Sequence, residues 1–208
     1  MNKALSERAY HHGNLREALL EQAIAALDTM PAEQLSLRAI ARSLGVSQTA
    51  PYRHFNGKEA LFAAIATRGY QTLLTSLEAA RRGAGPDATA QLHAVARAYV
   101  DFAAQQKQLF KLMFGPLVQP SETYPELREV SRETLLLVQS IMHAGVEQGV
   151  IQDGDLINLS NSAWGGIHGL ATLTIDAPEL FRRHIDLLRQ IDLSLEIFIR
   201  GVRPIGVQ

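Results

Sequence analysis

The chain has 208 residues, of which 47% are hydrophobic and 20% charged, enough apolar material for one large or two small folded domains and too much for a disordered chain. Twenty basic and 21 acidic residues leave a formal net charge of −1, which argues against a strongly basic nucleic-acid coat and a polybasic membrane binder. The absence of cysteine excludes disulfide scaffolds, cysteine-ligated metal sites and thiol nucleophiles, and it fits a reducing cytoplasm.

Neither the N-terminal residues nor the uncharged stretch 156–175 favours a membrane protein. Residues 1–13 contain charged side chains and no apolar run, so we expect no secretory signal and a cytoplasmic location. The uncharged stretch 156–175 contains seven polar residues and three glycines. A bilayer-spanning helix needs about 20 predominantly apolar residues. We therefore expect a helix buried in the protein, and no membrane partner.

Apolar residues recur at spacings of three and four along the whole chain, which predicts an all-α fold. An N-terminal three-helix, helix-turn-helix DNA-binding domain is expected at 10–57, a connecting helix at 58–82, and a C-terminal helical bundle for ligand binding and dimerisation at 83–203. Gly83-Ala84-Gly85-Pro86-Asp87 marks the second boundary. The expected helices lie at about 14–30, 37–44, 47–55, 58–82, 88–106, 108–114, 126–149, 155–175 and 178–200.

Residues 36–55 have the pattern of a helix-turn-helix. Ser36 can cap the first helix, Ala41 is small enough to let two short helices cross, and Gly45 supplies the positive φ of the turn. The outward face of 47–54 carries hydroxyl, amide, guanidinium and imidazole groups. Such groups can bind base edges or phosphates when a helix enters the major groove.

Several segments, in this order and spacing, resemble the TetR family of transcriptional regulators: YHHGNLR at 10–16, LSLRAIARSLGVS at 35–47, APYRHF at 50–55 and KEAL at 58–61. The similarity is close over about residues 8–75. The segment WGGIHG at 164–169 is similar to the tryptophan–histidine–glycine (WHG) motif of one subgroup of TetR C-terminal domains. The resemblance implies two-domain, all-helical homodimers, usually repressors, that leave their double-stranded operator DNA when a small ligand enters the C-terminal domain.

Residue by residue, the resemblance implies a set of DNA contacts. Gln48, Thr49 and Ala50 take base-edge positions, and Lys58 opens the long helix, where its charge and the backbone N–H groups favour a phosphate. The other members are Ser36 and Arg38 against the DNA backbone, Ser47, and Tyr52, Arg53 and His54 against phosphates or bases.

Two parts of this set stay open. Pro51 departs from the commoner family pattern and costs about 3 kcal/mol inside a helix, so a short recognition helix with an irregular start is expected. Which of the residues 47–49 reaches a base is therefore undecided. The N-terminal residues are either an arm against the DNA or a solvated surface: Arg8, Tyr10, His11 and His12.

The large apolar residues between 88 and 175 form either a plain core or the wall of an effector pocket. Trp164 and His168 are four residues apart and therefore share a helical face inside the uncharged stretch. The resemblance favours a pocket there, for an apolar or weakly polar effector, and the alternative is a hydrogen-bonded core histidine packed by tryptophan. The apolar wall expected beside this pair is formed by Phe102, Phe110 and Phe114.

Small residues in 155–175 predict close helix packing. Gly165, Gly166 and Gly169 each cost about 1 kcal/mol relative to alanine in a helix, so a helix–helix contact is expected to require them. We expect a homodimer in which the helices at about 155–175 and 178–200 form an intersubunit four-helix bundle. The two heads would then bind half-sites about 34–36 Å apart, and an effector that changes this separation would weaken binding.

Two other classes of protein compete with this interpretation. For an enzyme, Ser160, His168 and Asp176 are suitable residue types, but no Gly-x-Ser-x-Gly elbow exists. No histidine pair has the spacing of a metal site. A helical interaction module that carries a helix-turn-helix is the third class. We predict a regulator with no catalytic residue, metal or cofactor.

The near-neutral charge conceals an asymmetry. Residues 1–58 contain seven basic and five acidic residues and three histidines, whereas residues 59–208 contain 13 basic and 16 acidic ones. A modestly basic N-terminal part and a mildly acidic remainder indicate DNA binding that depends on shape and specific contacts more than on total charge.

Overall fold

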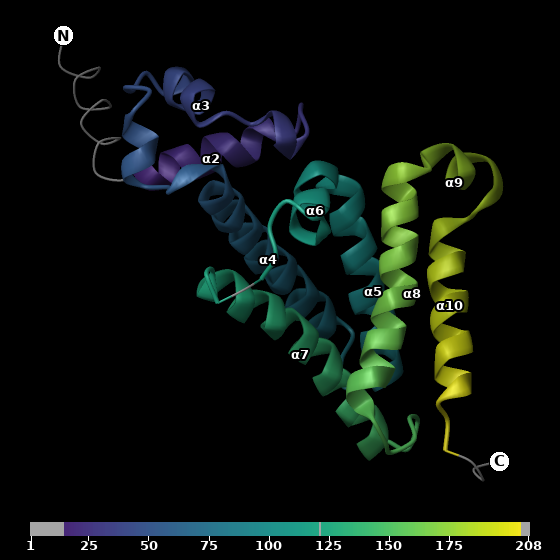
Figure 1. The fold of residues 1–208 in the computed structure, drawn as a ribbon. Coiled ribbons are helices and arrows are strands. Elements are labelled where there is room, and N and C mark those ends of the chain that lie inside the picture. Colours follow the sequence, from purple (N-terminus) through teal and green to yellow (C-terminus); the bar gives the residue numbers. More distant parts are fainter. Residues whose placement is uncertain (1–14, 121, 205–208) are drawn as a thin grey trace. The chain divides into compact units, whose positions relative to one another are not determined.

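The structure, a computed structural model, describes residues 15–120 and 122–204 (Figure 1). Within these residues nine α-helices and two short 3-10 helices follow one another and no β-strand occurs, so the predicted all-α fold is confirmed. The helices form two compact units. Unit 1 holds the described residues among 1–69 and 108–128, and unit 2 holds those among 70–107 and 129–208.

Unit 1 is built on a small helical head. Its elements are α2 (Leu15–Ala26), the 3-10 helix η1 (Ala32–Gln34), α3 (Leu37–Ser43), the 3-10 helix η2 (Ala50–Arg53), the first part of α4 (Gly57–Gly83), nearly all of α6 (Lys107–Phe114) and the start of α7 (Pro125–Glu147). α3 packs against both α2 and η2. The core of the head is formed by the side chains of Leu19, Leu20, Ala23, Leu37, Ile40, Ala41 and Phe55.

The turn after α3 has the hydrogen bonds of a Schellman motif. Gly45 has a φ of +69°, its N–H donates to the Arg42 carbonyl oxygen at 3.0 Å, and the Val46 N–H donates to the Ala41 carbonyl oxygen at 3.0 Å. Glycine adopts this positive φ without strain. The predicted turn of the helix-turn-helix is confirmed.

A glycine also lets α4 and α6 approach each other inside unit 1. A Cβ atom at Gly69 would lie 2.6 Å from Met113 Sδ and 3.0 Å from Leu109 Cδ1. These distances are shorter than van der Waals contact, so a larger side chain at residue 69 would force the Met113 and Leu109 side chains of α6 to shift. The close approach attaches α6 to the same unit as the helix-turn-helix.

Unit 2 is a helical bundle formed by the rest of α4 and α7 together with α5 (Ala88–Gln105), α8 (Leu156–Asp176), α9 (Pro178–His184) and α10 (Leu187–Gly201). α5, α8 and α10 pack against one another (Figure 1). α10 is held to α5 by Asp192, which accepts from Arg97 Nη2 at 2.7 Å and lies 3.0 Å from His93 Nδ1.

The predicted single helix at 178–200 is wrong, because the chain breaks between α9 and α10. Ile185 has extended backbone angles, and the Asp186 side chain accepts a hydrogen bond from the Arg189 N–H at 3.2 Å. An aspartate at this N-cap position satisfies a free amide of the first turn, so α10 begins anew at Leu187.

None of the described helices combines the length and the apolar character that are needed to cross a bilayer.

Candidate DNA interface and effector site

The segment 47–54, which we call the reading segment, differs from the predicted helix at 47–55. Only a 3-10 helix forms, at Ala50–Arg53. Pro51 has no N–H to donate to the Ser47 carbonyl oxygen, which instead accepts from the Ala50 N–H at 2.9 Å. Proline lies in the first turn of this helix, where amides lack an intrahelical partner. The expected irregular start is confirmed, and the helix is shorter than expected.

The reading segment has one buried and one exposed side. Pro51 and, directly after the segment, Phe55 are buried and fix the segment to the head, while Tyr52 is 50% exposed. The other exposed side chains of the segment are those of Ser47, Gln48, Thr49, Arg53 and His54, whereas Ala50 is half-buried. Because the anchors are apolar and buried, the polar side is held in a defined orientation.

Hydrogen bonds distinguish the three residues at the start of the segment. Ser47 Oγ lies 2.9 Å from Thr49 Oγ1 and accepts a hydrogen bond from the Thr49 N–H at 3.3 Å. Both hydroxyls are thus engaged in the local turn. The exposed Gln48 amide has no hydrogen bond to any residue that the structure describes. Of the three, Gln48 is the side chain with the most hydrogen-bonding capacity left for a base edge.

The remaining predicted DNA contacts surround the segment. Ser36 caps α3, with its hydroxyl accepting from the Ala39 N–H at 3.4 Å, and Arg38 is exposed in the first turn. Lys58 donates from Nζ to the Glu33 carbonyl oxygen, and this ammonium lies 5.3 Å from the centre of the Phe62 ring. The proposed N-terminal arm, Arg8, Tyr10, His11 and His12, lies outside the described residues.

In unit 2, Trp164 and His168 lie together on α8, with ring centroids 4.9 Å apart. A third residue, Tyr99 of α5, joins them. The indole N–H of Trp164 donates to the Tyr99 hydroxyl oxygen at 3.3 Å, and this hydroxyl forms a hydrogen bond of 2.8 Å with His168 Nδ1. Burial raises the pKa of the Tyr99 hydroxyl and lowers the pKa of His168 below its usual value. Both groups are therefore neutral at neutral pH.

Tyr99 is one of the large apolar residues between 88 and 175 and was not predicted as a partner of Trp164 and His168. A tyrosine on the buried face of a helix needs a partner for its hydroxyl, and His168 lies in the uncharged stretch that packs against it. The predicted wall residues are divided between the units. Phe102 is buried in unit 2, whereas Phe110 and Phe114 of unit 1 form a tilted ring contact with centroids 4.7 Å apart.

α8 also has an exposed side. Ile157 is 60% exposed and Leu173 is 43% exposed. Gly165 and Gly166 are exposed as well, and a Cβ atom at either would meet nothing within 4 Å. Contacts within this chain therefore do not require glycine at these two positions.

Known proteins match both parts of the chain. Residues 19–65 match the family described as "Bacterial regulatory proteins, tetR family", and residues 92–198 match "Tetracyclin repressor-like, C-terminal domain". An uncharacterized helix-turn-helix transcriptional regulator of Bacillus subtilis (strain 168), YobS, is 25% identical over 91% of this chain and 93% of its own length.

Solved structures match the chain over nine tenths of its length or more. A protein of unknown function from Rhodococcus sp. RHA1 is 32% identical and superposes with a TM-score of 0.80 over 94% of this chain and 98% of its own. A bacterial regulatory protein of the tetR family from Rhodococcus RHA1 is 25% identical, with a TM-score of 0.65 over 90% and 96% of the two chains.

An exposed polar segment on a helix-turn-helix head, followed by a separate helical unit, defines the class of two-domain helical DNA-binding regulators. The chain belongs to the TetR family of bacterial transcriptional regulators. Proteins of this family bind operator DNA and act as dimers with small-molecule effectors, and they are generally not enzymes.

Proposed function

We propose that this chain is a homodimeric repressor that binds its operator through the reading segment and leaves it when a small effector binds beside Trp164 and His168. In this proposal the domain at 10–57 binds the DNA, and the helix at 58–82 connects it to the domain at 83–203, which binds the effector and the partner subunit. One observation carries the proposal: the exposed Gln48 amide stands on a segment that buried Pro51 and Phe55 fix to the head.

In this proposal Gln48 reads a base edge, for which adenine is the best match because an amide can bind its N6 and N7 together. Ser47 and Thr49 hold the turn and bring the half-buried Ala50 close to the groove. The remaining contacts are with phosphates or with neighbouring bases and come from Ser36, Arg38, Tyr52, Arg53, His54 and Lys58.

The effector is apolar or weakly polar. Support comes from the neutral state of Tyr99 and His168, since a charged ligand would be desolvated without a countercharge beside them. We infer that Trp164, His168 and Gly169 correspond to the WHG motif of its subgroup. Phe102, which lies in the same unit, is proposed as its apolar wall.

The partner subunit packs on α8 and α10. Ile197 of α10 is 63% exposed and Leu193 is 44% exposed, and Ile157 and Leu173 add apolar surface on α8. Exposed apolar side chains on neighbouring helices favour burial against another protein surface. The exposed glycines at 165 and 166 would allow the partner backbone to come close. A two-fold axis here presents two reading segments to two half-sites.

Fluorescence anisotropy with the DNA upstream of the protein's own gene tests the function. We expect about a thousandfold or greater preference over a scrambled duplex of equal length at moderate salt. The full chain with Gln48 intact is compared with Gln48→Ala on both duplexes. Absence of any sequence preference in the intact chain would refute the regulator proposal.

A second measurement tests the effector site. Every small molecule that releases the DNA should change the fluorescence of Trp164, the single tryptophan of the chain. A releasing ligand that leaves this emission unchanged, in intensity and in wavelength, would place the effector elsewhere.

A further inference from the structure

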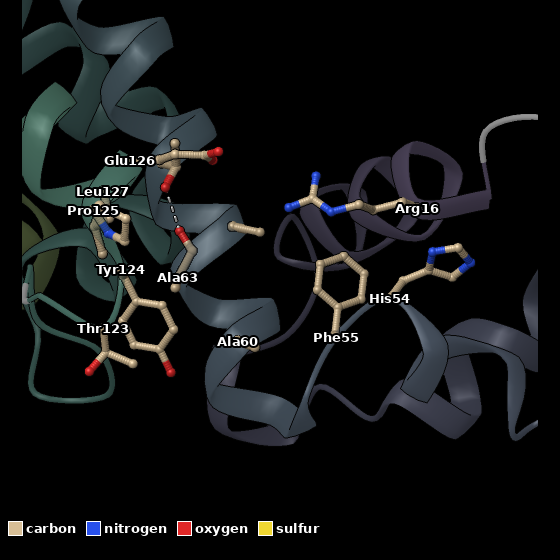
Figure 2. Close-up of a pocket in the computed structure, with 12 residues that line it drawn as sticks. Arg16, His54, Phe55, Ala60, Ala63, Thr123, Tyr124, Pro125, Glu126 and Leu127 are labelled. Atoms are coloured by element: carbon tan, nitrogen blue, oxygen red, sulfur yellow. Dashed lines mark hydrogen bonds between the residues drawn. The ribbon is translucent and has the colours of Figure 1, made fainter.

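A pocket of about 230 Å³ lies wholly within unit 1, apart from the Trp164 cluster of unit 2 (Figure 2). We call it the head pocket. Its sides come from α2, from the end of the reading segment, from α4, and from the segment 123–127 that enters α7. Drug-sized ligands occupy about 300–1,000 Å³, so the head pocket suits a smaller molecule with a single ring.

The α4 side of the head pocket is apolar and smooth. It is formed by Ala60, Ala63, Ala64 and Thr67, which lie three or four residues apart and so share a helical face. The Thr67 hydroxyl already donates to the Ala63 carbonyl oxygen at 2.8 Å, so this side chain adds no unsatisfied polar group. Such a surface is suited to the flat face of a ring.

Aromatic side chains stand on two sides of that surface. Figure 2 shows Phe55 beside α2 and the reading segment, and Tyr124 on the side of the 123–127 segment. Two aromatic walls favour a planar ligand, because offset or edge-to-face ring contacts are more favourable than the burial of equal aliphatic area.

The charged groups of the head pocket lie on different sides. The Arg16 guanidinium lies over the Phe55 ring, 5.3 Å from its centre. Its neighbour Glu17 is paired with Arg68 at 2.6 Å, and no described carboxylate forms an ion pair with Arg16. Glu126 lines the pocket from the start of α7, on the side of Tyr124 (Figure 2). One side thus offers a cation with five N–H donors, and the other offers a hydrogen-bond acceptor.

We propose that the head pocket is a second ligand site, which binds a small aromatic carboxylate carrying a hydrogen-bond donor on the opposite side of its ring. The carboxylate binds Arg16, the ring lies on the alanines of α4 between Phe55 and Tyr124, and the donor binds Glu126. The site is separate from the proposed effector site, but His54 of the reading segment lines it. Binding is therefore tested on the full chain without DNA, so that its failure and the failure of operator binding are distinguishable.

The probe is 4-hydroxybenzoate, titrated into the full-length protein by isothermal titration calorimetry. We expect a dissociation constant of about 0.1–1 mM, as befits a ligand with few atoms. Arg16→Gln should weaken binding about tenfold, because it removes a charge-assisted hydrogen bond at an exposed position. Ala64→Phe should abolish binding by filling the pocket. Ala79→Phe, an exposed position further along α4, is the matched control and should bind as the parent does.

Related ligands separate the contributions. 4-Hydroxybenzamide has the same shape without the charge and should bind the parent protein about tenfold more weakly, with no further loss in Arg16→Gln. No heat of binding at millimolar 4-hydroxybenzoate would overturn the proposal. So would binding that survives both Arg16→Gln and Ala64→Phe, or binding that only Trp164→Phe removes. The exposed Arg16 variant keeps the test decisive if Ala64→Phe does not fold.

Discussion

The reading segment of unit 1 and the Trp164–Tyr99–His168 cluster of unit 2 use polar side chains in opposite ways. In the reading segment the Gln48 side chain is exposed and has no hydrogen bond to a described residue. In the cluster the polar side-chain atoms form hydrogen bonds with one another. Exposed groups on a rigid support contribute to binding and little to stability. Buried groups contribute to both, because an unpaired buried polar atom is costly.

The support beneath the reading segment should show the largest effect. Ala41 is fully buried at the packing of α3 in the head. Ala41→Leu adds three carbon atoms there and should lower the free energy of unfolding of unit 1 by about 3 kcal/mol, the upper end of the cost of overpacking. Specific DNA binding should be lost with it. Urea unfolding followed by circular dichroism measures this change.

Ala39→Leu provides the control, since Ala39 is exposed on the same helix. It should change the free energy of unfolding by about 0.5 kcal/mol or less. Equal losses in the two variants would show that the crossing of the helices does not depend on a small residue.

Gln48→Ala should have the next largest effect, and on binding alone. The loss of a base contact is expected to cost about 1–3 kcal/mol of discrimination, with no change in the unfolding midpoint. Anisotropy titrations with the specific and the scrambled duplex measure it. Lys58→Ala is the contrasting variant and should weaken binding to both duplexes alike. The number of counterions released on binding, taken from the salt dependence, should fall by about one. An equal loss from Gln48→Ala on both duplexes would contradict its role.

The fold of the head could be predicted from the sequence because local interactions determine it. Ser36, Ala41 and Gly45 each have one local role, as cap, crossing residue and turn, and the structure places them accordingly. The helix at 47–55 was predicted too long because the missing amide of Pro51 outweighed the apolar spacing. The break at Ile185–Asp186 was missed because apolar spacing continues through it.

Contacts between distant segments could not be predicted from spacing. Tyr99 and Trp164, which share a hydrogen bond, are 65 residues apart along the chain, and only the packing of α5 on α8 brings them together. The same holds for the segment 123–127, which only the fold brings against α4 to line the head pocket. The residues proposed for DNA and effector binding remain predictions.

Tyr99→Phe tests the buried half of the comparison. It removes the hydroxyl that bonds Trp164 Nε1 and His168 Nδ1, and it should lower the free energy of unfolding by about 1 kcal/mol. Trp164 emission should shift as well. Tyr52→Phe removes an exposed hydroxyl from the reading segment and should leave stability within about 0.5 kcal/mol. Equal effects on stability would remove the distinction between the two regions.

The smallest effect concerns the charge of His168. Burial lowers its pKa in the folded protein below the unfolded value of about 6.5, so the unfolded chain takes up the proton more readily. The destabilisation from this proton uptake is absent well above pH 6.5, and it grows as the pH falls through that value towards the folded pKa. Because His168 is only half-buried, we expect this loss of stability to be about 0.5 kcal/mol or less after solvent screening.

His168→Gln cannot take up this proton, so its melting temperature should fall less than that of the parent between about pH 7.5 and 5.5. Parallel falls would mean that the cluster accepts the charged imidazolium as readily as water does, and the proposed preference for a weakly polar effector would lose its electrostatic support.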